Sequence, residues 1–132
     1  MAKESGLGWT TFSVDNSSGT LKAIVADITN ASWQTPRAVQ DVTGLDKSAI
    51  ERLHLLADFS VEMSGVFNDA TDFSHDVFKV LSGTRTCTIV VSGQTLTNEI
   101  LLTDYNLTRA DDGSFTWQVP GVLQSGTVPT WS

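Results

Sequence analysis

Hydrophobic and polar residues alternate most regularly in the middle of the chain. The alternating positions run in the order Ala57, Asp58, Phe59, Ser60, Val61, Glu62, Met63 and Ser64. A period of two is typical of a β-strand that packs one face against a core and turns the other face to water. We therefore expect a half-buried strand over residues 57–64.

Similar patterns predict strands at both ends of the chain. Residues 9–14 and 21–25 flank a turn cluster, Asp-Asn-Ser-Ser-Gly, and predict an N-terminal hairpin over residues 9–25. Residues 85–92 and 95–109 predict two further strands, joined by a tight turn at Ser92, Gly93 and Gln94.

The long segment 95–109 changes its apolar face near Leu101 and Leu102. This change predicts a bulge or bend, or a region buried on both sides. A turn at residues 110–113 then leads into residues 114–119, where Phe115, Trp117 and Val119 alternate with polar residues. That alternation predicts a hairpin with one packed face and one wet face.

Two short helices are expected between these strands. Ser48 and Glu51 have the spacing of a capping box, which predicts a helix over residues 50–55. Thr71 or Asp72 can cap a second helix, whose apolar stripe is Phe73, Val77, Phe78 and Leu81. Both helices would cover the sheet.

The remaining segments are irregular. Pro36 cannot donate to a central ladder, so residues 27–42 are expected to form an edge or an extended arm. Residues 120–132 contain two prolines and two glycines and are expected to form a nonregular tail. We predict one domain over residues 1–132, a mainly antiparallel β-sandwich or barrel with one or two short helices. The hairpin 9–25, the arm and the tail are candidate inter-subunit segments.

Composition narrows the function. The chain of 132 residues has a formal charge of -7 and a pI near 4.5, which disfavours binding to nucleic acid through phosphate neutralisation. Cys87, the single cysteine, lies in an apolar run and predicts a buried structural thiol. The sequence shows neither the apolar core of a signal peptide nor a run long enough to anchor the chain in a membrane.

Catalytic, cofactor and metal motifs are absent from the sequence. His54 and His75 lack the spacing of a zinc site. Ser74, His75 and Asp76 have the residue types of a nucleophilic triad, but neighbours on a helix point about 100° apart and cannot form its relay. Crowded aspartates such as Asp69 and Asp72 are typical of helix starts and turns. We expect neither an enzyme nor a cofactor.

The four tryptophans leave two possibilities open. Trp117 alternates with polar residues and is expected in the core. Trp33 and Trp131 lie in nonregular segments, where a tryptophan can anchor an interface or offer a platform for a sugar ring. We favour an interface, with the candidate inter-subunit residues Trp33, Pro36, Arg37 and Trp131.

The order of motifs resembles the tail tube, or major tail, proteins of long-tailed bacteriophages, particularly those that infect actinobacteria. The motifs are VTGLDKSAIERL at residues 42–53, a strand, the turn at residues 65–68 and the segment Ser-His-Asp-Val-Phe at residues 74–78. The resemblance implies rings, typically of six subunits, whose sheets join edge to edge and which stack into a hollow tube. It also implies a virion location, assembly in the host cytoplasm, tape-measure and other tail proteins as partners, and passage of double-stranded DNA without specific binding.

Under this interpretation, one polar strand face lines the lumen of the tube. The candidate lumen residues are Asp58, Ser60, Glu62, Asp104, Asn106, Thr116 and Gln118. The same residues could instead form an outward, solvated sheet face. A ring-forming tail adaptor or terminator, and a monomeric carbohydrate- or receptor-binding β-sandwich, remain alternatives.

Overall fold

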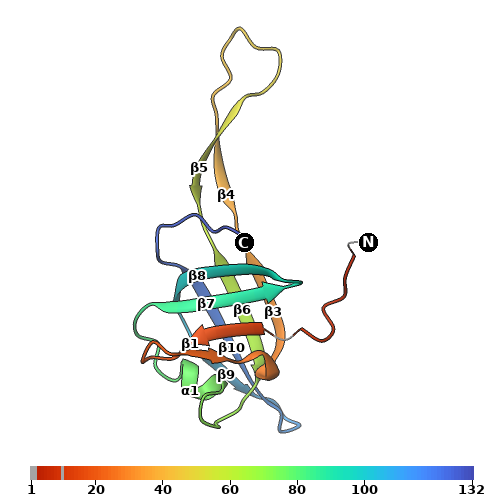
Figure 1. Ribbon diagram of the computed structural model, residues 1–132, viewed down its shortest axis with the longest axis vertical. Coiled ribbons are helices and arrows are strands. Elements are labelled where there is room, and N and C mark those ends of the chain that lie inside the picture. The colour runs from red at the N-terminus through yellow and green to blue at the C-terminus, as the bar shows by residue number, and fades with distance from the viewer. Residues whose placement is uncertain (1–2, 10) are drawn as a thin grey trace.

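The predicted antiparallel β fold is confirmed by the computed structural model, which describes residues 3–9 and 11–132 (Figure 1). The strands are β1 Thr11–Asp15, β2 Leu21–Ala23, β3 Ile28–Gln34, β4 Arg37–Asp41, β5 Arg52–Ala57, β6 Ser60–Val66, β7 Arg85–Val91, β8 Gln94–Leu102, β9 Asn106–Arg109 and β10 Phe115–Leu123. A 3-10 turn, η1 Val25–Asp27, and one short helix, α1 Ser74–Phe78, complete the described elements.

The main sheet has the order β2-β1-β7-β8-β10-β6-β3, with β9 paired to β10. It folds over itself, so that β1, β7 and β8 form one layer and β9, β10, β6 and β3 form the other (Figure 1). The inward side chains of the two layers make one core, in which the largest fully buried side chain is Trp117, as its alternation predicts. Burial raises the pKa of the Cys87 thiol to about 12, which agrees with the predicted structural role.

Several predicted turns are confirmed. Ser92 and Gly93 join β7 to β8 with φ values of 52° and 76°, the left-handed pair that a two-residue hairpin turn needs. The predicted break in segment 95–109 falls between the end of β8 at Leu102 and the start of β9 at Asn106. The N-terminal hairpin pairs β1 with β2, although β1 begins at Thr11 and Thr10 lies outside the described residues.

The helix predicted over residues 50–55 is wrong. This segment lies mostly in β5, which pairs with β4 as a separate two-stranded hairpin. The Glu51 N–H donates to the Thr43 Oγ1 at 2.8 Å, and the Glu51 carbonyl accepts from the Val42 N–H at 2.9 Å. Pairing across the hairpin therefore replaces the capping box that Ser48 and Glu51 could have formed.

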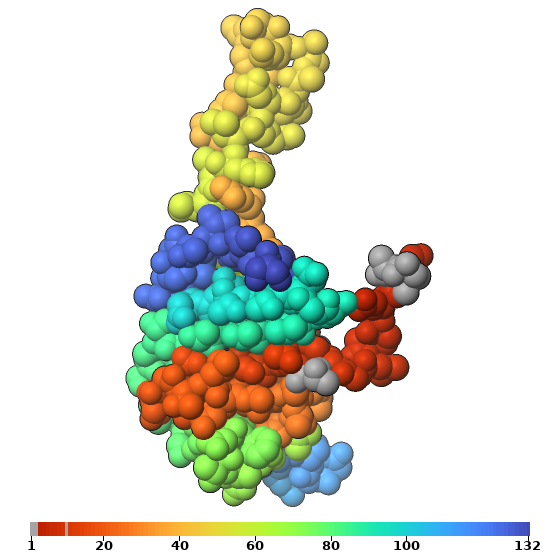
Figure 2. All heavy atoms as spheres, viewed as in Figure 1, coloured from red at the N-terminus to blue at the C-terminus, as the bar shows by residue number. Residues whose placement is uncertain are grey.

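The extended arm is also displaced from its predicted bounds of 27–42. Residues 28–34 form β3 within the main sheet, whereas residues 37–57 form the β4–β5 hairpin, which projects far from the rest of the molecule (Figures 1 and 2). We call residues 37–57 the arm and the remaining described residues the body. Pro36 lies at the junction of the two, where its carbonyl accepts from the Asp58 N–H at 2.9 Å.

Helix α1 is shorter than its predicted stripe. Val77 and Phe78 are buried as expected, but Leu81 is exposed and lies beyond the helix. Neither Thr71 nor Asp72 caps α1 with its side chain, because the N-cap is Phe73 and Asp72 adopts a φ of 72°. Instead, buried Asp27 accepts from the Ser74 N–H at 3.0 Å. A carboxylate from η1 thus fixes the start of the helix.

Strand β10 continues beyond its predicted end, so Pro120 and Gly121 belong to the sheet and not to a nonregular tail. The Pro120 carbonyl accepts from the Thr103 N–H at 3.2 Å, so its nitrogen faces the break between β8 and β9. The missing donor therefore costs no ladder bond. The tail proper, residues 124–132, lies along β8, and Leu96 and Trp131 form an isolated bridge.

Candidate assembly surfaces

One layer of the sheet has a polar outward face. Residues directly opposite in antiparallel strands share a face, and the register connects such residues across β3, β6, β10 and β9. We call this set the polar face: Asn30, Ser32, Gln34, Ser60, Glu62, Ser64, Val66, Asn106, Thr108, Thr116, Gln118, Pro120 and Val122. Most members are hydroxyl or amide residues, and the members include no lysine or arginine.

Five of the seven candidate lumen residues lie together on the polar face. They are Ser60, Glu62, Asn106, Thr116 and Gln118. Gln118 is directly opposite Ser64 on one side and Asn106 on the other. The other two candidates, Asp58 and Asp104, are exposed residues of the loops before β6 and before β9.

The layer that carries the polar face has two edges. Among the described strands, β3 pairs only with β6 along one side of the layer, and β9 pairs only with β10 along the other. An edge strand presents N–H and C=O groups that another strand can bind. Two edges on opposite sides of one layer allow each copy of a chain to contact two neighbours.

The arm carries exposed apolar side chains on a thin support. Its exposed large apolar residues are Val39, Leu45, Ile50, Leu53, Leu55 and Leu56. Leu56 is 87% exposed and Ile50 is 62% exposed. An isolated two-stranded hairpin is marginally stable in water, so such a hairpin is suited to packing against another molecule.

The charges divide unequally between the arm and the body. The arm holds three basic residues and three acidic ones, namely Arg37, Lys47, Arg52, Asp41, Asp46 and Glu51. The formal charge of -7 is therefore carried by the body. A neutral, apolar arm and an acidic body are chemically different surfaces of the same chain.

The four candidate inter-subunit residues do not form one site. Trp33 lies in β3, where its ring packs against Trp9 with centroids 5.7 Å apart. Arg37 opens the arm and donates from Nε to the Leu55 carbonyl at 3.2 Å. Trp131 lies at the end of the tail and is 42% exposed.

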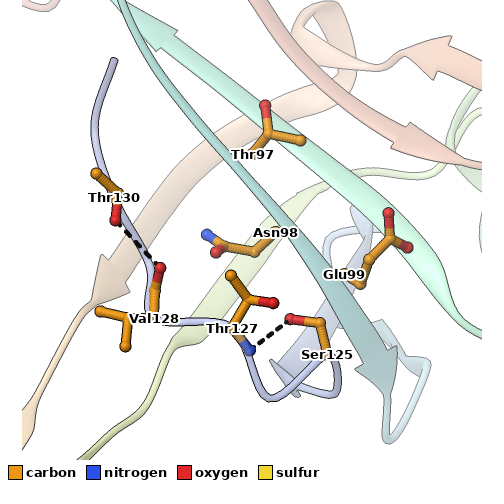
Figure 3. Close-up of a pocket in the computed structure, with 7 residues that line it drawn as sticks. All are labelled: Thr97, Asn98, Glu99, Ser125, Thr127, Val128 and Thr130. Carbon is orange, nitrogen blue, oxygen red and sulfur yellow. Dashed lines mark hydrogen bonds between the residues drawn. The ribbon is translucent and has the colours of Figure 1, made fainter.

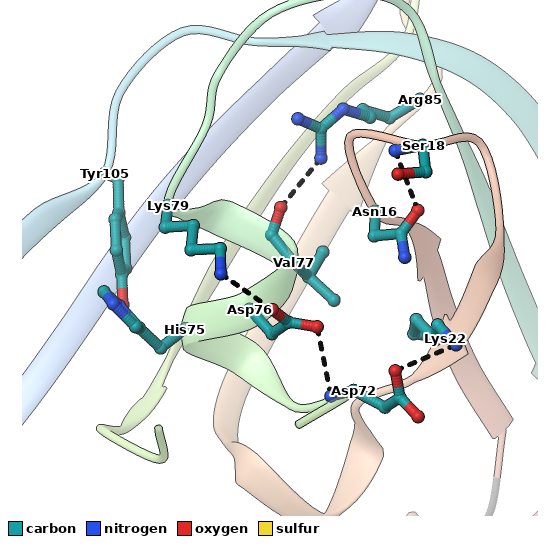
Figure 4. A network of polar contacts seen from close by, with 10 residues as sticks. All are labelled: Asn16, Ser18, Lys22, Asp72, His75, Asp76, Val77, Lys79, Arg85 and Tyr105. Carbon is teal, nitrogen blue, oxygen red and sulfur yellow. Dashed lines mark hydrogen bonds and ion pairs between the residues drawn. The ribbon is translucent and has the colours of Figure 1, made fainter. Parts of the chain in front are cut away.

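His75 and Asp76 of the apparent triad point to separate partners (Figure 4). The His75 Nδ1 lies 3.1 Å from the Tyr105 hydroxyl, whereas an Asp76 carboxylate oxygen lies 3.0 Å from the Lys79 Nζ. The hydroxyl of Ser74 is buried with no partner among the described residues. The side chains therefore form no Ser-His-Asp relay. Among the described residues, no cluster of three potential metal ligands occurs, and no helix is long and apolar enough to cross a membrane.

Sequence comparison finds no matching family model and no matching characterised protein. Structure comparison finds several similar chains, among them two from gene transfer agent particles. One belongs to the tail of an empty gene transfer agent particle, computed with helical refinement and C6 symmetry. It has a TM-score of 0.76 and 16% identity, and the match covers 98% of each chain. The other belongs to the virion of a native gene transfer agent particle, with a TM-score of 0.73, 13% identity and coverage of 98% of this chain and 99% of that one.

The chain shares the fold of these gene transfer agent chains. Sequence reasoning found the alternation that makes the polar face of this fold. It placed the arm at residues 27–42 instead of 37–57 and missed the path of the tail. The apolar residues of the arm are visible in the sequence, but their spacing suits a short helix as well as a hairpin. The edges at β3 and β9 depend on which strands pair, which no local pattern encodes.

Proposed function

We propose that the chain is a tail tube subunit, whose copies form rings of six that stack into a hollow tube and conduct DNA from a virion into a host. The observation that carries this proposal is the polar layer bounded by β3 and β9, because joining these edges between copies extends one sheet around a ring. The C6 symmetry of a gene transfer agent tail whose subunit has the same fold supports a ring of six.

The polar face would line the lumen in this arrangement. Its hydroxyl and amide groups, together with Glu62, Asp58 and Asp104, offer phosphate no cationic partner. DNA binds proteins chiefly by releasing counterions as lysine and arginine neutralise its phosphates. A lumen without these residues lets DNA slide without being held.

The arm would join one ring to the next. Its apolar residues lie beyond the body, where they can reach a stacked copy (Figure 2). The subunit would be assembled in the host cytoplasm beside a tape-measure protein and other tail proteins. A single-ring adaptor would use the same sheet edges and differ in forming no stack.

Electron microscopy across a concentration series of the purified chain tests the proposal. We expect tubes with a regular axial repeat and a central channel. Isolated rings at every concentration would contradict the tube and support the single-ring adaptor. A persistent monomer that binds glycans would instead support the carbohydrate-binding alternative.

A matched pair of charge variants tests the lumen separately. Glu62→Lys adds positive charge on the polar face, and Asp58→Lys in the same variant adds it in the loop directly before β6. The control, Asp69→Lys with Asp111→Lys, adds the same charge at exposed residues elsewhere. Both variants should form tubes of normal length in particles, and only the first should reduce DNA delivery. Equal DNA delivery by the two variants would contradict the proposal that the polar face lines the lumen.

A further inference from the structure

The C-terminal tail, residues 124–132, stands away from the middle of β8. The tail is joined to β8 at two places. The Gln124 N–H donates to the Glu99 carbonyl at 2.9 Å, and Ser132 and Thr95 exchange two hydrogen bonds at 2.8 and 2.9 Å. From residue 99 to 95 β8 advances four residues, whereas from 124 to 132 the tail advances eight. The tail therefore arches away from the strand and borders a hollow of about 310 Å³ (Figure 3).

The hollow is lined almost entirely by polar residues of these two segments. Strand β8 contributes Thr97, Asn98 and Glu99, and the tail contributes Ser125, Thr127, Val128 and Thr130. The volume of 310 Å³ equals that of about ten molecules of liquid water and lies at the lower end of the range for ligand pockets. The hollow is therefore of a size to hold one small polar molecule.

Asn98 supplies a donor to the hollow. The residue is 7% exposed, and its Nδ2 has no hydrogen-bond partner among the described residues. Figure 3 shows its amide pointing into the hollow, toward the tail. A buried N–H that donates to nothing destabilises the fold, and a ligand that accepts from it removes this effect. The orientation of Asn98 thus indicates a ligand that carries a hydrogen-bond acceptor.

The backbone of β8 offers both a donor and an acceptor next to Asn98. Because Thr95 turns its N–H and C=O toward the tail, alternation along the strand turns those of Thr97 the same way. No described tail residue bonds to either group of Thr97. A ligand in the hollow can therefore both accept from this backbone and donate to it.

The tail supplies hydroxyl groups on the other side of the hollow. Ser125 and Thr127 extend from the tail toward β8 (Figure 3). The Ser125 Oγ accepts from the Thr127 N–H at 3.2 Å, so the Ser125 hydroxyl proton can still be donated to a ligand. A hydroxyl both donates and accepts, so these two side chains suit either kind of ligand group.

The lining is uncharged where it faces a ligand. Among the described residues that line the hollow, Glu99 alone is charged. Its carboxylate points away from the tail (Figure 3) and accepts from the Thr86 Oγ1 at 2.7 Å. An ion in the hollow would lose water without gaining a partner of opposite charge. The Asn98 N–H also disfavours a metal cation, which binds oxygen. The lining therefore selects an uncharged ligand.

We propose that the hollow between β8 and the tail binds a small uncharged polyhydroxyl molecule, of the size of a monosaccharide. The Asn98 Nδ2 and the Thr97 N–H donate to its oxygens, and the Thr97 carbonyl accepts from one of its hydroxyls. Ser125 and Thr127 bind it from the tail. Each hydroxyl of such a molecule can donate and accept, which matches a lining where donors and acceptors alternate.

Amide NMR spectra of the unassembled, isotope-labelled chain test the site during titration with glucose, galactose or glycerol. For at least one sugar we expect saturable shifts of the Asn98 side-chain amide and the Thr97 backbone amide. A ligand of about twelve non-hydrogen atoms should have a dissociation constant on the order of 1 mM. If none of the three probes gives saturable shifts up to about 100 mM, the hollow holds water only and the proposal is overturned. Saturable shifts with phosphate or Ca²⁺ in place of the sugars would also overturn it.

Matched variants separate a ligand site from a structural role. Asn98→Leu keeps nearly the same shape and removes the donor, so the sugar should bind about tenfold or more weakly while the unliganded chain melts at the same or a higher temperature. Thr127→Val removes one hydroxyl at an exposed position and should weaken binding about threefold to tenfold. Thr20→Val, in the exposed β1–β2 turn, is the control and should bind as the wild type does. Equal affinities for all three variants, or a lower melting temperature of Asn98→Leu with unchanged binding, would overturn the site.

The site can fail independently of the tail tube function. It lies within one copy, and its lining includes neither Trp33 nor Trp131, so it differs from the tryptophan platform that the sequence left open. A chain that forms tubes and binds none of the probes overturns the site and leaves the tube function standing. A chain that binds the sugar through Asn98 and forms no tubes supports the site and contradicts the tube.

Discussion

The body and the arm contain similar apolar residues, but these residues are buried in the body and exposed in the arm. In the body, alternating apolar side chains from two layers meet in one core, in which Phe12, Ile89 and Trp117 are almost completely buried. In the arm, Leu53, Leu55 and Leu56 are exposed on a hairpin with no layer to cover it. The same chemistry therefore stabilises the single copy in one region and favours association in the other.

Removing apolar groups from the arm should have the largest effect on assembly. The variant Leu53→Ser with Leu55→Ser should form no tubes in electron micrographs, because the arm loses the surface that a stacked copy would bury. The free energy of unfolding should change by less than about 0.5 kcal/mol, since both side chains are already exposed.

The control removes similar apolar surface from the other end of the body. Val80→Ser with Leu81→Ser changes exposed residues next to α1, which lies far from the arm (Figure 1). This variant should form tubes. If neither variant formed tubes, assembly would depend on exposed apolar surface at both ends of the molecule. That result would contradict the distinction between arm and body.

Removing an apolar group from the body should instead change stability. Trp117→Ala leaves a large cavity between the layers and loses the hydrogen bond from Nε1 to the Val66 carbonyl at 2.9 Å. The free energy of unfolding should fall by about 3–5 kcal/mol, measured by denaturant titration of the unassembled chain. A loss below about 1 kcal/mol would show that the two layers are not packed as described.

A single methyl group tests how closely the body is packed. A Cβ at Gly65 would lie 1.8 Å from the Asp27 carbonyl oxygen, a backbone atom that cannot move alone. Gly65→Ala should cost about 1–3 kcal/mol. At Gly121 the nearest atom is the Cδ1 of Ile100, at 2.9 Å, which is the movable end of a side chain. Gly121→Ala should cost less, and the reverse order in thermal denaturation would contradict this packing.

The smallest expected effect is a pH-dependent loss of stability at α1 in acid. The Lys79 side chain, followed by the Asp72 N–H, lowers the pKa of Asp76 below its usual value. The ionised form is thus favoured in the folded state, so its stabilisation is complete above the unfolded pKa of about 3.9 and is lost as the pH falls through the folded value. The difference in unfolding free energy between the wild type and Asp76→Asn should shrink between about pH 5 and pH 2. Asp69→Asn, in the loop before α1, is the control, and equal pH profiles for the two variants would contradict this role.

The sequence predicts more of the body than of the arm for a physical reason. Alternation over residues 57–64 indicates burial of Phe59, Val61 and Met63, because their pleat direction is local. The segment 50–55 has no such signal, since partners eight or more residues away decide between helix and hairpin. The polar face follows from alternation, whereas its edges and the path of the tail follow from pairing between distant segments. Register across distant strands is set by packing, which one strand does not contain.

Helix α1 is too short to be stable alone and depends on contacts with the rest of the domain. A helix of five residues does not persist alone in water. The buried Arg85 guanidinium holds it by donating to the Val77 carbonyl (Figure 4). It also donates to the carbonyls of Val80 and Ser82 and to that of Asp15 at the end of β1. The helix, the loop after it and two strands thus open together or not at all. The α1 amides should exchange with solvent only when the whole body unfolds, which makes the domain one cooperative unit apart from its arm.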